Sequence, residues 1–140
     1  MTEPRPVDAT PQGALTLLVV DDSAMMRTMI RRAATLTNFP IAQIFEAANG
    51  QEALAILERH DVDALFTDIN MPDMTGIELL ERMVGHERWR HILRVVISTD
   101  GSDSRRAEAN ALDVHAYVRK PFQPEVMRDV LSKLTIAREF

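Results

Sequence analysis

The residues best suited to chemistry in this sequence stand directly after apolar runs of strand length. In chain order they are Asp21 and Asp22, Asp68, Ser98 and Thr99, and Lys120. Carboxylates, hydroxyls and an ammonium group are what proteins use to bind a divalent cation together with a phosphoryl group. An aspartate in such a set can act as a nucleophile and form an acyl phosphate. The combination therefore indicates phosphoryl-transfer chemistry.

Three aspartates in one pocket would repel one another unless a cation lay among them. Because the set offers oxygen ligands but no cysteine or histidine, it favours Mg²⁺, or Mn²⁺, over zinc. Mg²⁺ takes few carboxylates and keeps coordination positions for water and phosphoryl oxygens. We therefore expect a magnesium site at these aspartates.

Helix capping is the alternative interpretation for any one of these residues. Asp22 or Ser23, for example, suits the N-cap of a helix that begins near Ala24. Chance capping is a poor explanation for the whole set, because its members lie at the ends of several strands of one predicted sheet.

The elements that must position these residues alternate between two periodicities. Short apolar runs predict strands at 15–20, 44–47, 64–67, 93–97 and 116–118, and segments of helical period follow each of them, including 51–59, 104–112 and 125–138. Five βα units with short connections imply an α/β fold, a doubly wound parallel sheet with helices on both faces. Ligands bind such sheets outside the carboxyl ends of the strands, where the polar residues lie.

Composition narrows the class of protein. The chain has 140 residues, which fits one domain, and no cysteine, which suits the cytoplasm. It contains no apolar run long enough to span a membrane, and its net charge of −5 argues against direct nucleic-acid binding. Residues 1–13 are rich in proline and lack the apolar core of a secretion signal, so we expect a flexible leader before a domain at 14–140.

Four motifs, in their order and spacing, resemble the response-regulator receiver family. They are Val19-Val20-Asp21-Asp22-Ser23, Phe66-Thr67-Asp68-Ile69-Asn70-Met71-Pro72, Ser98-Thr99, and Tyr117-Val118-Arg119-Lys120-Pro121-Phe122. The resemblance covers about residues 15 to 137 and is greatest to the single-domain, chemotaxis-type members. It implies the flavodoxin-like (βα)5 fold with strand order 2-1-3-4-5.

The resemblance also implies a metal shell and an acceptor. Asp68 would be the phosphoacceptor and also a ligand of the metal. Asp22 would bind Mg²⁺ directly, Asp21 partly through water, and the backbone carbonyl of Asn70 would complete the protein's share of the ligands.

The remaining site residues follow from the same resemblance. Lys120 would pair with the phosphoryl oxygens, and Pro121 would be a cis-proline. Ser98 is the expected switch hydroxyl because it lies 30 residues after Asp68 and 22 before Lys120. Thr99 would meet the phosphoryl group through its backbone N–H.

Tyr117 would be the aromatic switch residue. Phosphorylation would draw Ser98 toward the new oxygens, let Tyr117 turn inward, and repack the face of the fourth helix, fifth strand and fifth helix.

The expected partners are a sensor histidine kinase or phosphotransfer protein and a downstream protein target. The protein itself is expected to be a monomer or a weak dimer. Asn70 and Asp100 occupy positions that tune phosphoryl lifetime in similar receivers.

Other functions stay open at this point. A phosphohydrolase would use the same nucleophile, but such enzymes usually place a second aspartate where this chain has Asn70, so we expect only self-phosphorylation and self-dephosphorylation. A phosphate shuttle or sink would use the same chemistry without an output, and the chain could also be a receiver from a longer transcriptional regulator.

Overall fold

The computed structural model describes residues 13–139, with side chains described as far as Lys133. Residues 1–12 of the expected leader lie outside the described residues. None of the helices in the described part of the chain is long and apolar enough to cross a bilayer.

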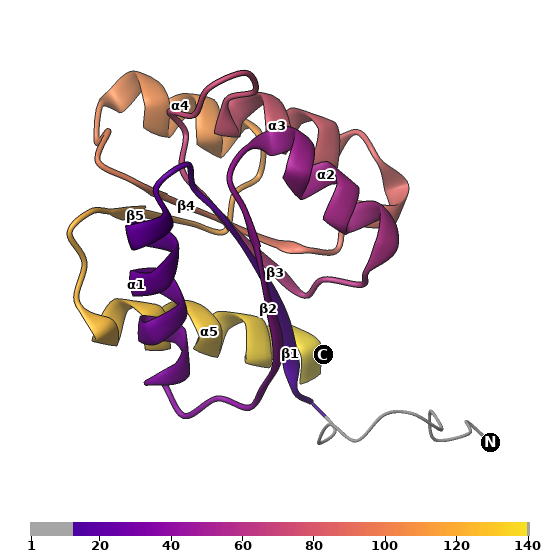
Figure 1. Ribbon diagram of the computed structural model, residues 1–140, viewed down its shortest axis with the longest axis vertical. Coiled ribbons are helices and arrows are strands. Elements are labelled where there is room, and N and C mark those ends of the chain that lie inside the picture. The colour runs from indigo at the N-terminus through magenta and orange to yellow at the C-terminus, as the bar shows by residue number, and fades with distance from the viewer. Residues whose placement is uncertain (1–12, 140) are drawn as a thin grey trace.

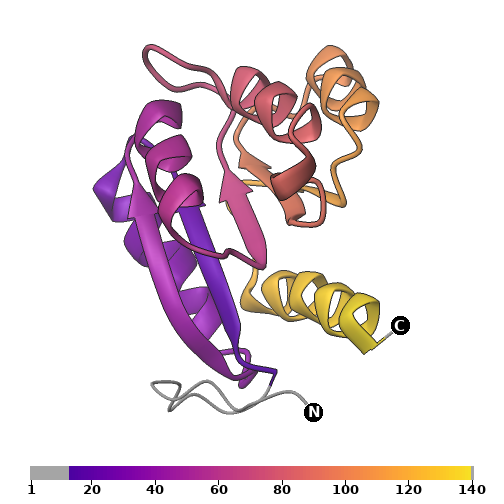
Figure 2. The same ribbon diagram turned by 90° about the vertical axis from the view of Figure 1, so that its right-hand side faces the viewer.

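Five strands form one parallel sheet in the order β2-β1-β3-β4-β5. Their bounds are β1 Leu15–Val20, β2 Ile41–Ala47, β3 Ala64–Thr67, β4 Leu93–Ser98 and β5 Ala116–Arg119. Figure 2 shows β2, β1 and β3 side by side, with the arrowheads of β2 and β3 pointing the same way. The expected topology is confirmed, and it places the carboxyl ends of β1 and β3 next to each other.

Helices cover both faces of the sheet, as Figure 1 shows. The helices are α1 Ala24–Thr35, α2 Gly50–Arg59, α3 Gly76–Val84, α4 Asp103–Ala111 and α5 Pro124–Glu139, with a short 3₁₀ turn η1 at Glu87–Trp89. Side chains of α1 and α5 share one apolar cluster with one face of the strands, and those of α2, α3 and α4 share the other. The central strands β1, β3 and β4 are buried on both faces, which explains their continuous apolar sequences.

Side-chain caps fix where the helices begin near the sheet's carboxyl edge. Ser23 accepts the backbone N–H of Met26 at 3.2 Å, so the expected cap of α1 is confirmed. Thr75 begins α3 with a capping box, in which its hydroxyl accepts the N–H of Glu78 while the Glu78 carboxylate accepts the N–H of Thr75. Ser102 is the N-cap residue of α4.

The strand limits differ from the sequence prediction mainly at β2. This strand begins at Ile41 rather than at residue 44, because β2 pairs with β1 along the whole of that strand. It lies at the edge of the sheet, where Ala42 and Gln43 are exposed, so its first half lacks the apolar pattern that identifies the central strands.

Candidate functional site

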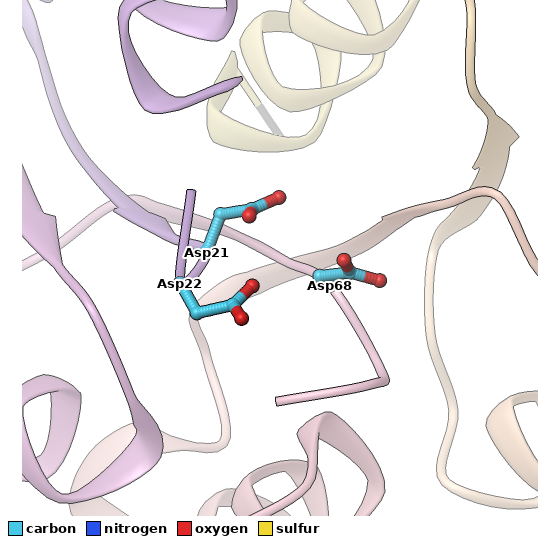
Figure 3. A group of neighbouring side chains, drawn as sticks. All are labelled: Asp21, Asp22 and Asp68. Atoms are coloured by element: carbon cyan, nitrogen blue, oxygen red, sulfur yellow. The ribbon is translucent and has the colours of Figure 1, made fainter. Parts of the chain in front are cut away.

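Three aspartates meet at the carboxyl ends of two neighbouring strands, β1 and β3. Asp21 and Asp22 follow β1 and Asp68 follows β3, and one carboxylate oxygen from each lies within 4.8 Å of the others. Figure 3 shows the three side chains extending in the same direction from these neighbouring strand ends. Asp21 is buried, Asp68 is partly exposed and Asp22 is exposed. The acidic cluster is therefore open to solvent on the side of Asp22.

Lys120 brings a positive charge to this cluster from the end of β5. Its ammonium donates hydrogen bonds to Oδ2 of Asp21 at 2.7 Å and to Oδ2 of Asp68 at 3.1 Å. Burial disfavours the ammonium, but the hydrogen bonds and charges of the two aspartates outweigh it and raise the pKa of Lys120. The peptide bond between Lys120 and Pro121 is cis, as expected.

Asp21 is held through its side chain and through its backbone. Its carboxylate accepts the N–H of Ser23 at 2.9 Å, and its carbonyl accepts a hydrogen bond from the guanidinium of Arg27 at 2.6 Å. Arg27 is itself paired with Glu46 of β2 at 2.9 Å. Arg27 was not among the residues expected from the sequence. In the sequence Arg27 looks like an ordinary helix-surface arginine, and its contact with Asp21 depends on how α1 packs against the sheet.

Gly76 packs against the backbone of Asp68. A Cβ atom at Gly76 would lie 2.0 Å from the carbonyl oxygen of Asp68, so only glycine fits there. The same carbonyl accepts the hydroxyl of Thr67 at 2.8 Å, and the N–H of Gly76 donates to Ile69 at 2.8 Å. These contacts fix the peptide that carries the Asp68 side chain.

Ser98 and Tyr117 are connected through Asp100, in the loop between β4 and α4. The fully buried Ser98 accepts the backbone N–H of Asp100 through its hydroxyl at 3.1 Å, and the hydroxyl of Tyr117 donates to the carbonyl of Asp100. The carboxylate of Asp100 accepts the N–H of Ser102 at 3.0 Å and a hydrogen bond from the Asn70 side chain. Hydrogen bonds from Ser102 are the main reason that the pKa of Asp100 is lowered.

Thr99 lines an apolar groove together with Lys120. The groove has a volume of about 440 Å³ and runs between α1 and the segment that joins β5 to α5. Its other walls are formed by Met26, Met29, Arg32, Ala33, Leu36, Pro121, Phe122 and Pro124. We call this hollow the α1 groove. Its lining includes Lys120, which contacts Asp68.

The donor set of the acidic cluster fits a small hard cation. Three carboxylates face the single positive charge of Lys120, so a divalent ion would remove most of the remaining repulsion. The ligands are oxygens, and the exposed Asp22 leaves room for water on the metal, which is how proteins usually bind Mg²⁺. The residues present therefore fit magnesium.

Comparisons with known proteins agree with the geometry. The family model of the response regulator receiver domain matches residues 17–132. A chemotaxis protein CheY homolog of Campylobacter jejuni is 36% identical over 116 residues, covering 82% of this chain and 88% of the relative. The chemotaxis protein CheY1 of Helicobacter pylori is also 36% identical over 116 residues, covering 82% of this chain and 92% of the relative.

Solved structures give the same result. The chemotaxis response regulator CheY4 of Vibrio cholerae superposes with a TM-score of 0.76 at 27% identity, covering 86% of this chain and 98% of that one. The REC domain of AraT, a response regulator from Geobacillus stearothermophilus, superposes with a TM-score of 0.76 at 33% identity, covering 90% of this chain and 96% of that one. Receiver domains of this family bind Mg²⁺ in their acidic pocket. The chain belongs to the response regulator receiver domain family, of the chemotaxis CheY type.

Proposed function

We propose that this protein is a phosphorylation-dependent signalling switch in which Asp68 accepts a phosphoryl group from a phosphohistidine on a sensor kinase or phosphotransfer protein. The observation that carries the proposal is the position of the Asp68 carboxylate, which lies beside two further aspartates and the ammonium of Lys120. No other aspartate of this cluster combines partial exposure with a direct contact to that lysine.

The chemical step is an exchange of one bond at phosphorus for another. A carboxylate oxygen of Asp68 attacks, the bond from phosphorus to the donor imidazole nitrogen breaks, and that nitrogen keeps the electron pair. Lys120 would then pair with a phosphoryl oxygen in place of part of its present contact to Asp68. In the later dephosphorylation water attacks phosphorus, the bond from phosphorus to the Asp68 oxygen breaks, inorganic phosphate leaves and the Asp68 carboxylate is restored.

Asp21, Asp22, Asp68 and the backbone carbonyl of Asn70 are the groups that would hold Mg²⁺. The bound ion would supply positive charge against the oxygens of the phosphoryl group. The protein's own contribution is position: Ser23 and Arg27 fix Asp21, and Gly76 fixes the peptide of Asp68. These contacts hold Asp21 and the peptide of Asp68 in place before the ion binds.

The donor would dock a helix in the α1 groove. The groove is apolar and its lining includes Lys120, which contacts Asp68, so a helix that lies in it would carry its phosphohistidine to the neighbourhood of Asp68. The exposed methionines Met25 and Met29 and the exposed Leu36 extend the apolar surface along α1. The output would be read by a protein that contacts α4, β5 and α5.

Labelling with a small phosphodonor tests the proposed function without any partner. The protein is mixed with Mg²⁺ and acetyl phosphate, and acid-stable, base-labile phosphate on the chain is measured. We expect labelling of the natural protein, none after chelation of the metal and none in Asp68→Asn. A Mg²⁺ titration of Asp22→Asn should show much weaker binding, because that variant loses a direct ligand. Label that persists in Asp68→Asn would refute the assignment.

A further inference from the structure

The side chain of Tyr117 is contacted by two groups that lie outside β5. Its hydroxyl donates a hydrogen bond to the carbonyl of Asp100 in the β4–α4 loop. On the ring face lies the guanidinium of Arg106 from α4, with its Cζ atom 4.7 Å from the ring centroid. The two contacts act on the end and on the face of one side chain.

The loop that receives the Tyr117 hydroxyl is also tied to α4. Asp100 pairs through its carboxylate with Arg105 at 3.6 Å, and it accepts the N–H of Ser102, the residue that caps α4. Arg105 and Arg106 are neighbours near the start of α4, and they contact the two partners of one hydrogen bond. The beginning of α4 thus contacts the β4–α4 loop through Arg105 and the Tyr117 ring through Arg106.

We propose that Arg106 is a positioning residue that latches the Tyr117 ring against the β4–α4 loop, so that α4, and not Ser98 alone, decides the direction of the ring. A cation over a partly exposed aromatic ring changes the ratio of two ring positions by about two- to five-fold. The assignment of Tyr117 to signal output rests on the function proposed above. The latch itself needs no phosphoryl group.

The competing explanation is that Arg106 merely lies on a ring that other contacts hold in place. The two cases differ in the effect of Arg106 on the ionisation of Tyr117. Burial is the main cause that raises the pKa of Tyr117, and the charges of Asp100 and Asp68 act in the same direction. Arg106 and Arg105 act in the opposite direction, because a cation stabilises the phenolate. Removing Arg106 from a ring that stays in place must therefore raise the pKa further.

A ring that is released behaves in the opposite way. Once the ring turns into solvent it loses the burial that raised its pKa, and the pKa of Tyr117 falls toward its ordinary value. Tyr117 is the single tyrosine of the chain, so the absorbance of tyrosinate reports on this residue alone. The direction of the change separates the two explanations.

The test is an alkaline absorbance titration of the full chain without phosphodonor or Mg²⁺, for the natural protein, Arg106→Ala, Arg106→Gln and Arg106→Lys. Circular dichroism at each pH restricts the comparison to folded protein. We expect the pKa of Tyr117 to fall in Arg106→Ala and Arg106→Gln and to stay near the natural value in Arg106→Lys. A rise, or no change, in the two neutral variants would overturn the latch. Because the titration needs no phosphorylation, its failure would leave the role of Asp68 untouched.

Discussion

The ammonium of Lys120 lies 2.7 Å from the carboxylate of Asp21, although the two residues are 99 positions apart in the sequence. Their side chains are 7% and 2% exposed, so the pair is buried at the carboxyl edge of the sheet. The contact joins the end of β5 to the end of β1 across β3 and β4. It is the longest-range link in the site, and it depends on the complete sheet.

Replacing Lys120 should therefore reveal how strongly the carboxylates repel one another. In Lys120→Met we expect the free energy of unfolding without metal to fall by about 3 kcal/mol, because a buried Asp21 loses its partner. Added Mg²⁺ should recover part of the loss by neutralising the same carboxylates. Urea unfolding with and without Mg²⁺ measures both effects. Lys133→Met, at an exposed position of α5, is the matched control, and an equal loss in both variants would contradict the role of Lys120.

Gly76 should tolerate no side chain. A methyl group there collides with the carbonyl oxygen of Asp68, so Gly76→Ala should cost about 1–3 kcal/mol and lower the rate of phosphorylation as well. Gly85→Ala is a fair comparison, because a Cβ atom at Gly85 would meet Glu81 at an ordinary contact distance of 3.5 Å. Chemical unfolding and acetyl phosphate labelling of both variants check the prediction. If Gly76→Ala is as stable as Gly85→Ala, the close approach is not a constraint.

His115, the residue before β5, should make the free energy of unfolding depend on pH. His115 accepts the backbone N–H of Arg94 through Nδ1 at 3.0 Å, and a protonated imidazole cannot accept it. Burial, followed by the charge of Arg94, lowers the pKa of His115; Asp113 opposes this shift and Lys133 adds to it. The folded chain therefore binds this proton less readily than the unfolded chain does. The resulting stability is complete above about pH 6.5 and is lost as the pH falls through the folded-state pKa.

Urea midpoints between about pH 7.5 and pH 5 test the role of His115. His115→Asn keeps a hydrogen-bond acceptor but cannot take up a proton, so its stability should fall less over this range than that of the natural protein. Equal slopes for the two proteins would show that other groups cause the pH dependence.

The α1 groove should affect the rate of phosphotransfer from a protein donor but not the rate of labelling by a small-molecule phosphodonor. Met29→Glu places a charge on the apolar wall, so we expect transfer from a phosphohistidine-bearing helical domain to slow by tenfold or more, on the order of 1.4 kcal/mol. Labelling by acetyl phosphate should stay unchanged, because Met29 is outside the acidic cluster. Ala107→Glu, on the exposed side of α4, is the control. Equal transfer rates to Met29→Glu and the natural protein would show that the donor does not dock in the α1 groove.

The sequence identified the acidic cluster and the sheet because both depend on short-range patterns. Uninterrupted apolar runs mark β1, β3 and β4, and the parallel topology brings residues at their carboxyl ends together. The first half of β2 was missed because an edge strand needs no apolar run. Roles for Ser98, Thr99, Asn70 and Tyr117 in the phosphorylated protein stay predictions.

Contacts of long side chains were beyond the reach of sequence patterns. Arg27 reaches the carbonyl of Asp21 and Arg106 covers Tyr117, yet both look like ordinary helix-surface arginines in the sequence. Arg94 lies within the apolar strand β4, and the sequence does not indicate that its side chain will be buried. In the structure its guanidinium donates hydrogen bonds to the carbonyls of Arg90, Ile92 and Asp113. Tertiary packing alone determines these contacts.

Chemical trapping of the phosphorylated residue tests the central claim most directly. The protein is treated with Mg²⁺ and acetyl phosphate, the acyl phosphate is reduced with borohydride, and peptide mass spectrometry locates the aspartate that has become homoserine. We predict conversion of Asp68, dependent on both the phosphodonor and Mg²⁺, with Asp21 and Asp22 unchanged. Conversion at either of those residues in place of Asp68, or no conversion at all, would contradict Asp68 as the phosphoacceptor.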